Sequence, residues 1–246
     1  MCIRDRCWLL CSVTAHGDLN RMHQFKDKAV QQRELVSAGL FLYPVLQAAD
    51  VLAYRAEEGP VGDDQRQHVE LMRDIAERFN ARFGDVLVPP GHVIPEVGAR
   101  IMDLQDPTRK MSTTGSEQRG LIYIDDDEKA IVKKIKSAVT DSGSEVRRGE
   151  GKEGITNLID ILAVVRGTTP DAIEAEFEGE QYGAFKGAVA EAVVDYLRPV
   201  RERYQELRPD EAVLEAALAG GAERAHALAS ETLADVRRAM GVGPPV

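Results

Sequence analysis

The 246-residue sequence predicts an α/β portion to about residue 120, followed by an all-α portion that continues nearly to the C-terminus. Short strand-like runs lie only in the first half, at 86–88 and 99–104. Beyond residue 125, apolar residues recur at helical spacing between Gly-, Pro- and Asp-containing connections. Because the strand-like runs and the uninterrupted helical spacing lie in separate parts of the chain, we expect two domains, 1–120 and 121–246.

The individual elements follow from the same patterns. Residues 27–56 have helical apolar spacing that is interrupted at Gly39 and Pro44, and 59–62 form a turn or short strand. A helix is expected over 63–83, with an inner face of Val69, Leu71, Ile75, Ala76 and Phe79. In the second half, the expected helices are 126–140, 153–166, 170–176, 182–206, 210–219 and 221–240.

Composition and cysteine usage exclude several classes of protein. The formal net charge of −10 argues against nonspecific coating of nucleic acid, although a local basic face can still bind RNA. All three cysteines fall within the first eleven residues, which favours reduced thiols in a cytoplasmic protein over disulfides or a metal site. No run approaches the roughly 20 apolar residues of a membrane span, and the short apolar run after Arg6 has no persuasive cleavage site. We expect neither a membrane protein nor a secreted one.

Two segments of the first half combine polar groups with room for a ligand. In Gly62-Asp63-Asp64-Gln65, a glycine before a helix start lets a ligand approach the backbone, and N–H groups there favour phosphate or hydroxyl groups. The alternative is a plain turn and helix cap. In the Ala-rich segment 43–51, Asp50 lies one or two helical turns from Tyr43, where a carboxylate on an apolar helix is costly unless it has a partner. The alternative is a surface aspartate.

A third segment, 106–115, places Arg109, Lys110 and three hydroxyls in a loop rich in turn-forming residues. Such a loop can fold over a polyphosphate, with lysine as a mobile point charge and the hydroxyls as donors. A solvated basic loop is the alternative. Each of the three segments is weak by itself, but their order along the chain strengthens the case.

In this order the segments resemble the bacterial tryptophanyl-tRNA synthetases, which are class I aminoacyl-tRNA synthetases. The resemblance covers roughly 17–241 and is specific because it is long. It is carried by the segments 21–28, 38–40, 43–44, 48–50, 60–68, 98–102, 110–114, 133–142 and 177–179. The fold it implies is an incomplete Rossmann-like (HUP-type) nucleotide-binding domain, over 1–120, followed by a helical anticodon-binding domain with the C-terminal helices, over 121–246.

The resemblance implies a tryptophan–tRNA ligase. In such an enzyme, the carboxylate of tryptophan attacks the α-phosphate of Mg²⁺-bound ATP, and the adenylate is passed to the 3′ end of tRNA(Trp). The reaction needs in-line positioning and cations near the phosphates rather than a dedicated proton-transfer residue. The expected cofactors are ATP and the Mg²⁺ that accompanies it, with no metal held by the protein, and the expected assembly is a homodimer in the cytoplasm.

The site residues carried over by the resemblance form two sets. Asp50 would accept the indole N–H as a buried carboxylate, and the other tryptophan contacts would be Tyr43, Val51, Val61 and Gln65. The ATP contacts would be Gly62, Asp63, Asp64, Ile101, Lys110, Met111, Ser112, Thr113 and Thr114. Of these, the catalytic positions would be Lys110, Ser112 and Thr113. We make no claim for Gln47, which stands where the family commonly has methionine.

The chain departs from the family pattern at two places. The family loop is usually KMSKS, whereas 110–114 read KMSTT, so Thr113 replaces a cation and weaker transition-state stabilisation is expected. The 246 residues also contain no HIGH-type phosphate-binding motif. We therefore expect a chain that lacks the N-terminal part of the enzyme and that does not form tryptophanyl-adenylate when expressed alone.

The helical half would contact tRNA, with Lys133, Lys134 and Lys136 as candidate phosphate contacts, helped by Arg147, Arg148 and Lys152. A solvated helix face is the alternative for this run. For the whole chain, the alternatives are a tyrosine-type class I synthetase and a non-catalytic fragment that binds tRNA or dimerises.

Overall fold

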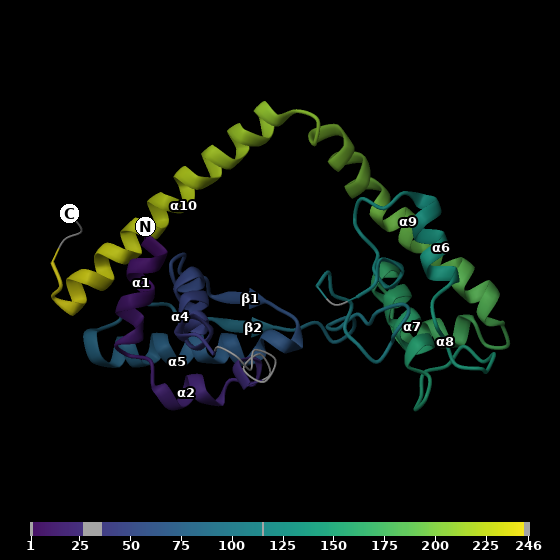
Figure 1. The fold of residues 1–246 in the computed structure, drawn as a ribbon, viewed down its shortest axis with the longest axis horizontal. Helices are drawn as coiled ribbons and strands as arrows, with labels where there is room; N and C mark the ends of the chain where they lie inside the picture. The colour runs from purple at the N-terminus through teal and green to yellow at the C-terminus, as the bar shows by residue number, and fades with distance from the viewer. Residues whose placement is uncertain (1, 27–35, 115, 244–246) are drawn as a thin grey trace. The chain divides into compact units, whose positions relative to one another are not determined.

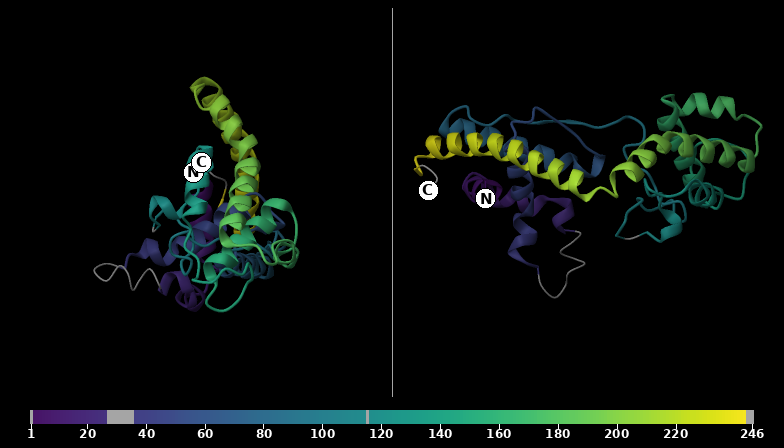
Figure 2. Two further views of the ribbon diagram at one scale, coloured as in Figure 1. Left: turned by 90° about the vertical axis from the view of Figure 1, so that its right-hand side faces the viewer. Right: turned by 90° about the horizontal axis from the view of Figure 1, so that it is seen from above.

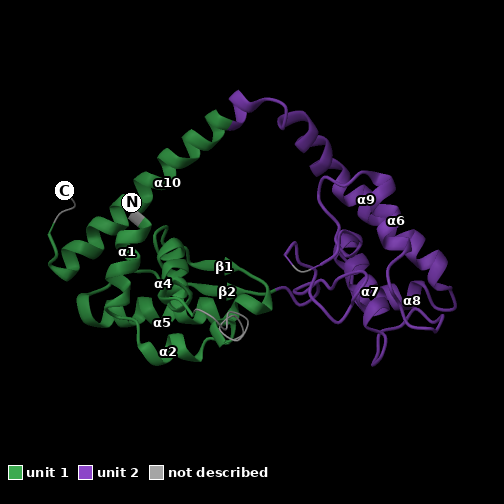
Figure 3. Ribbon diagram, in the orientation of Figure 1, with its two compact units in different colours: residues 1–94, 215–246 green, residues 95–214 purple. Residues whose placement is uncertain are grey.

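The computed structural model describes residues 2–26, 36–114 and 116–243. The chain divides into two compact units (Figure 3), of which unit 1 comprises 1–94 and 215–246 and unit 2 comprises 95–214. The predicted boundary near residue 120 differs from these divisions for two reasons. The segment 95–120 bonds to the helices that follow it, and the C-terminal helix packs on unit 1.

Unit 1 is a small α/β body (Figure 1). Its helices are α1 (Cys2–Cys11), α2 (His16–Arg21), α4 (Ala38–Leu52) and α5 (Arg66–Phe83), joined by most of α10 (Glu211–Met240). Strands β1 (Glu58–Pro60) and β2 (Gly91–Val93) pair in parallel, with Glu58 opposite Gly91 and Pro60 opposite Val93. The predicted inner face of the 63–83 helix is confirmed, since all five residues are buried in α5. This helix begins after the short 3₁₀ turn η1 (Asp63–Gln65).

Two predicted features of unit 1 are wrong, and a third cannot be compared with the structure. Residues 86–88 form no strand, because the side-chain amide of Asn80 donates to the Leu87 carbonyl and accepts from the N–H groups of Val86 and Leu87. Pro44 does not interrupt the helix; it is buried inside α4, where packing outweighs the missing N–H donor. Residues 27–35 of the predicted 27–56 helix lie outside the described part of the chain.

The C-terminal helix also differs from the prediction. The expected helices 210–219 and 221–240 form one helix, α10, which runs through Gly220 and Gly221 (Figure 2). Alanine-rich flanks favour the helix on both sides of the glycines. The last turns are held by burial of Ala229, Leu233 and Val236 in unit 1.

The regular elements of unit 2 are helices, and long irregular connections join them. These elements are η2 (Gln118–Gly120), α6 (Glu128–Lys136), α7 (Glu153–Arg166), α8 (Pro170–Glu176) and α9 (Tyr182–Leu207). Asp127 caps α6 by accepting from Ala130 N at 2.6 Å, so this helix begins two residues later than predicted. The 99–104 strand is reduced to an isolated bridge between Met102 and Lys110.

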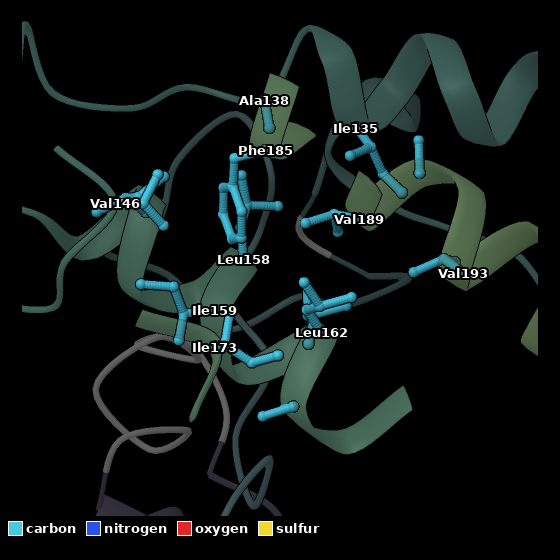
Figure 4. Close-up of a cluster of buried hydrophobic side chains, with 14 of the residues drawn as sticks. Ile135, Ala138, Val146, Leu158, Ile159, Leu162, Ile173, Phe185, Val189 and Val193 are labelled. Carbon is cyan, nitrogen blue, oxygen red and sulfur yellow. The ribbon is translucent and has the colours of Figure 1, made fainter. Parts of the chain in front are cut away.

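The core of unit 2 lies between α6, α7, α8 and α9 (Figure 4). Ile135, Leu158 and Phe185 are fully buried within it, and the rings of Phe177 and Phe185 meet edge to face with centroids 5.0 Å apart. The predicted fold class is therefore confirmed: a short parallel sheet with helices, followed by a helical body. None of the helices in the described ranges is long and apolar enough to cross a membrane.

Candidate active site

The turn between β1 and α5 carries the first group of predicted ligand contacts. The Gln65 N–H donates to the Gly62 carbonyl at 2.9 Å and closes η1. Asp63 and Asp64 are exposed on this turn, whereas Val61 and Gln65 are half-buried. Exposed carboxylates beside the start of a helix can accept hydrogen bonds from hydroxyl groups, which is the chemistry expected for a ribose.

A second group lies on α4 and is tied to α5. The hydroxyl of Tyr43 lies 3.2 Å from Nε2 of His68, which is only 2% exposed, and donates to Oε1 of Gln24 at 3.3 Å. The ring centroids of Tyr43 and His68 are 5.6 Å apart, and the two rings are tilted relative to each other. Burial raises the pKa of Tyr43, so the phenol stays protonated and keeps its donor at neutral pH. Tyr43, one of the predicted tryptophan contacts, is thus held against α5 by His68.

Gln47, for which no role was predicted, connects the two groups. Its Nε2 donates to Oε1 of Gln65 at 3.3 Å, and Nε2 of Gln65 donates to Oδ2 of Asp64 at 2.9 Å. The chain Gln47, Gln65, Asp64 therefore orients the side-chain amide of Gln65. A methionine at position 47 has no N–H donor and could not do this.

Asp50 is not the buried carboxylate that the sequence predicts. Residues Val45, Ala49 and Leu52 form the buried face of α4, and Asp50 lies on the outward face, where it is exposed. Partial desolvation still raises the pKa of Asp50, while the positive charge of Arg6 lowers it. The neighbouring Val51 is half-buried and packs against the core of unit 1. The assignment of these residues to the indole ring remains a prediction.

The predicted phosphate loop belongs to unit 2. Two short backbone segments, 101–103 and 109–111, run antiparallel: Met111 N donates to the Ile101 carbonyl and Asp103 N donates to the Arg109 carbonyl, both at 2.9 Å. Lys110 lies at the centre of this pair, opposite Met102, and is exposed. Ile101 and Met111 are half-buried and pack against the core of unit 2, so each presents only part of its side chain to a ligand.

The hydroxyl groups of the loop are arranged by backbone contacts. Thr114 N donates to Oγ of Ser112 at 3.3 Å, and Ser116 N donates to the Ser112 carbonyl at 3.0 Å. Thr113 and Thr114 are exposed. One cation and several hydroxyls thus lie on one exposed turn, a set made of donors, which suits the oxygen atoms of a polyphosphate.

Two buried polar residues beneath the loop were also missed. Asp103 is 4% exposed and accepts from the backbone N–H groups of Gln105 and Asp106 at 2.7 and 3.1 Å. Asn157 of α7, also 4% exposed, accepts from Met102 N at 2.8 Å and donates to the Met102 carbonyl at 2.9 Å. A polar residue inside the apolar pattern of 153–166 was the only available signal for Asn157.

The three predicted tRNA contacts on α6 differ in their surroundings. Lys133 and Lys136 are exposed. Lys134 forms an ion pair with Asp126 at 2.5 Å and lies over the ring of Tyr123, with its side chain only 15% exposed. A phosphate would have to compete with this internal pair, so Lys133 and Lys136 are the more accessible cations.

Comparison with known proteins identifies the family. The family described as tRNA synthetases class I (W and Y) matches residues 4–198. The chain belongs to this family. It is 47% identical over 239 residues to Tryptophan--tRNA ligase 2 of Streptomyces avermitilis, a match that covers 96% of this chain and 71% of the ligase.

Solved structures to which the chain is similar belong to tryptophanyl-tRNA synthetases as well. The chain is similar to the tryptophanyl-tRNA synthetase of Mycoplasma pneumoniae, with a TM-score of 0.87, 34% identity, and coverage of 99% of this chain and 74% of that one. It is also similar to the Campylobacter jejuni enzyme complexed with ADP and tryptophan, with a TM-score of 0.72, 32% identity, and coverage of 98% and 74%. The resemblance seen in the sequence is confirmed.

Proposed function

We propose that this chain is a tryptophan–tRNA ligase, which uses ATP to activate tryptophan and transfers the product to tRNA(Trp) in the cytoplasm. The observation that carries the proposal is the 47% identity to Tryptophan--tRNA ligase 2 over 96% of the chain. Sequence relatives at this level usually keep the substrate as well as the fold. The contacts of α4 with η1 within unit 1 support it, and so, separately, does the 110–114 loop of unit 2.

On the amino-acid side, Asp50 accepts the indole N–H, with Tyr43, Val51 and Val61 around the ring. Gln65 reaches the amino-acid or ribose end, and its amide is oriented by Gln47. Because a charged acceptor forms stronger hydrogen bonds than a neutral one, Asp50 selects a side chain that has an N–H group. Phenylalanine offers no such donor and leaves the carboxylate unpaired.

On the nucleotide side, Gly62, Asp63 and Asp64 line the nucleoside, and Ile101 and Met111 contact the adenine. Lys110 and the hydroxyls of 112–114 bind the phosphates. Mg²⁺ accompanies the nucleotide and neutralises phosphate charge; we assign it no protein ligand, since Asp63 already pairs with Arg66 at 3.1 Å. Thr113 supplies a hydroxyl where the family commonly has a cation, so Lys110 carries more of the charge stabilisation.

Tryptophan binding tests the substrate assignment. Calorimetric titration of the chain with L-tryptophan, L-tyrosine and L-phenylalanine should show a preference for tryptophan of about 100-fold or more. The variant Asp50→Ala should lose roughly 10- to 100-fold in tryptophan affinity, the range for a hydrogen bond to a charged group. Asp74→Asn, an exposed acid on α5, is the matched control and should change nothing. Preferential binding of tyrosine would instead indicate a tyrosine-type enzyme.

Two further assays separate activity from binding alone. Tryptophan-dependent exchange of pyrophosphate into ATP distinguishes a catalyst from a non-catalytic tRNA-binding module, and for these 246 residues expressed alone, which contain no HIGH-type motif, we expect no exchange. Gel shifts with tRNA(Trp) over a salt series test the exposed lysines, because each lost phosphate contact lowers the salt dependence of binding. Lys133→Ala and Lys136→Ala should each weaken binding more than Lys134→Ala. Sedimentation at several concentrations tests the proposed homodimer.

A further inference from the structure

A buried carboxylate lies beneath the 110–114 loop. Asp103 is 4% exposed and accepts hydrogen bonds from the backbone of Gln105 and Asp106 and from the side chain of Ser116. Burial alone would raise the pKa of Asp103, but these hydrogen bonds and the charge of Arg109 together lower it. The group is therefore ionised at neutral pH and can only accept hydrogen bonds.

The charge of Asp103 determines which hydrogen bonds the hydroxyl of Ser116 donates and accepts. Because an ionised Asp103 can only accept, the single hydroxyl proton of Ser116 points toward Asp103. The oxygen lone pairs of Ser116 are then available, and Ser116 Oγ accepts from the backbone N–H of Ser112 at 3.2 Å. The backbone N–H of Ser116 returns a bond to the Ser112 carbonyl at 3.0 Å. Ser112 is thus held at both its N–H and its carbonyl by one serine.

The base of this arrangement is fixed to the rest of unit 2. Asn157 binds both backbone groups of Met102, the residue before Asp103, and so ties the segment to α7. On another side, Leu104 N donates to the Gly120 carbonyl at 3.0 Å. A Cβ atom at Gly120 would lie 2.0 Å from Oδ1 of Asp103, so the close approach of this backbone requires glycine.

We propose that Asp103 and Ser116 are positioning residues of the synthetase loop, and that they set the place of Ser112 through the hydroxyl of Ser116. The inference rests on the proposed function of the loop as the phosphate-binding segment. A loop that is ordered before ATP arrives loses less conformational freedom on binding. This matters here because Thr113 leaves the loop with fewer cations to hold the phosphates in place.

The test compares Ser116→Ala, which removes the hydroxyl, with Ser116→Thr, which keeps it. Hydrogen exchange of the full chain, resolved to the Ser112 amide, is measured without nucleotide or tryptophan. We expect Ser116→Ala to speed exchange at Ser112 by roughly fivefold or more, the factor that one typical hydrogen bond contributes. Ser116→Thr should restore the wild-type rate. The exposed Ser144→Ala is the matched control and should leave the rate unchanged.

A second variant probes the carboxylate itself. Asp103→Asn keeps the size of the side chain and an acceptor for Gln105 and Asp106, but its amide can donate to Ser116 and so compete with Ser112 for the same lone pairs. Exchange at Ser112 should therefore rise, and trypsin should cut faster after the exposed Arg109 and Lys110. Exchange in α9 should not change, which shows that unit 2 stays folded.

The outcomes decide the proposal without ambiguity. Exchange at Ser112 within twofold of wild type in Ser116→Ala would overturn it, as would a loss of protection that Ser116→Thr does not restore. Because these measurements contain no substrate, they are independent of the proposed function, which fails if the chain does not bind tryptophan in preference to tyrosine and phenylalanine. In calorimetric titration, Ser116→Ala should weaken the binding of ATP and leave the binding of tryptophan unchanged.

Discussion

Replacing Asn157 with alanine should loosen unit 2 at the base of the loop. The substitution removes two hydrogen bonds, of 2.8 and 2.9 Å, between α7 and the backbone of Met102, 55 residues away in sequence. Each bond contributes about 1 kcal/mol net, and unpaired backbone groups cost about 1–3 kcal/mol when buried. Met102 is half-buried, so water can satisfy part of what is lost. We therefore expect a loss of about 2–3 kcal/mol.

Hydrogen exchange of peptides from α7 and α9 is the suitable assay, because it reports the opening of unit 2 by itself. A loss of 2–3 kcal/mol corresponds to exchange about 30- to 150-fold faster. The neighbouring Thr156→Val is the control: its buried Oγ1 has no hydrogen-bond partner among the described residues, so valine should be neutral or stabilising. If Asn157→Ala accelerates exchange less than threefold, the reasoning about this bridge is wrong.

Three further predictions concern other contacts. Gln47→Met should weaken tryptophan or ATP binding by roughly fivefold, because the side-chain amide of Gln65 loses the hydrogen bond that orients it. A double-mutant cycle with Gln65→Met measures the coupling between the two side chains. Gly154→Ala should destabilise unit 2 by about 1–3 kcal/mol, because its Cβ would lie 2.1 Å from the carbonyl oxygen of Val139. The matched variant Gly187→Ala in α9, whose Cβ would meet no neighbouring described atom within 4 Å outside its own helix, should stabilise by up to about 1 kcal/mol. Thermal unfolding measures both changes. Burial raises the pKa of Asp141, but hydrogen bonds from Tyr182 and Gly143 outweigh burial, so the pKa in the folded chain is lowered. Asp141 therefore stabilises the fold above its ordinary pKa of about 3.9, and this stabilisation is lost as the pH falls through the lower pKa of the folded chain. Asp141→Asn should therefore have a lower free energy of unfolding than wild type at pH 7, and this difference should shrink toward pH 3.

Several elements could be predicted from the sequence because their signals are local. The bounds 153–166 and 170–176 match α7 and α8, since apolar spacing, a glycine at the end of α7 and Thr169 with Pro170 at the start of α8 all point the same way. The buried face of α5 followed from its apolar period. Local chemistry alone was enough for these helices.

The errors occurred where side-chain contacts and core packing outweigh local preference. Residues 86–88 have a strand-like composition, but Asn80 occupies their backbone groups. Pro44 is a helix breaker by preference, but its position in the core of unit 1 keeps α4 intact. The resemblance implied a buried carboxylate at Asp50, whereas Asp50 lies on the exposed face of α4, the alternative that the residue pattern had left open.

By itself, the sequence determined the family, the order of the segments predicted to bind ligands and the amphipathic helices, because the order of motifs and the apolar period can be seen in consecutive residues. Only the tertiary structure decided which side chains hold those segments in place. Gln47 meets Gln65, Asp103 meets Ser116, and Asn157 meets Met102 across 18, 13 and 55 positions. A polar side chain shows no periodicity that reveals its partner, and such contacts form only after the apolar faces have packed and brought the donors and acceptors within reach.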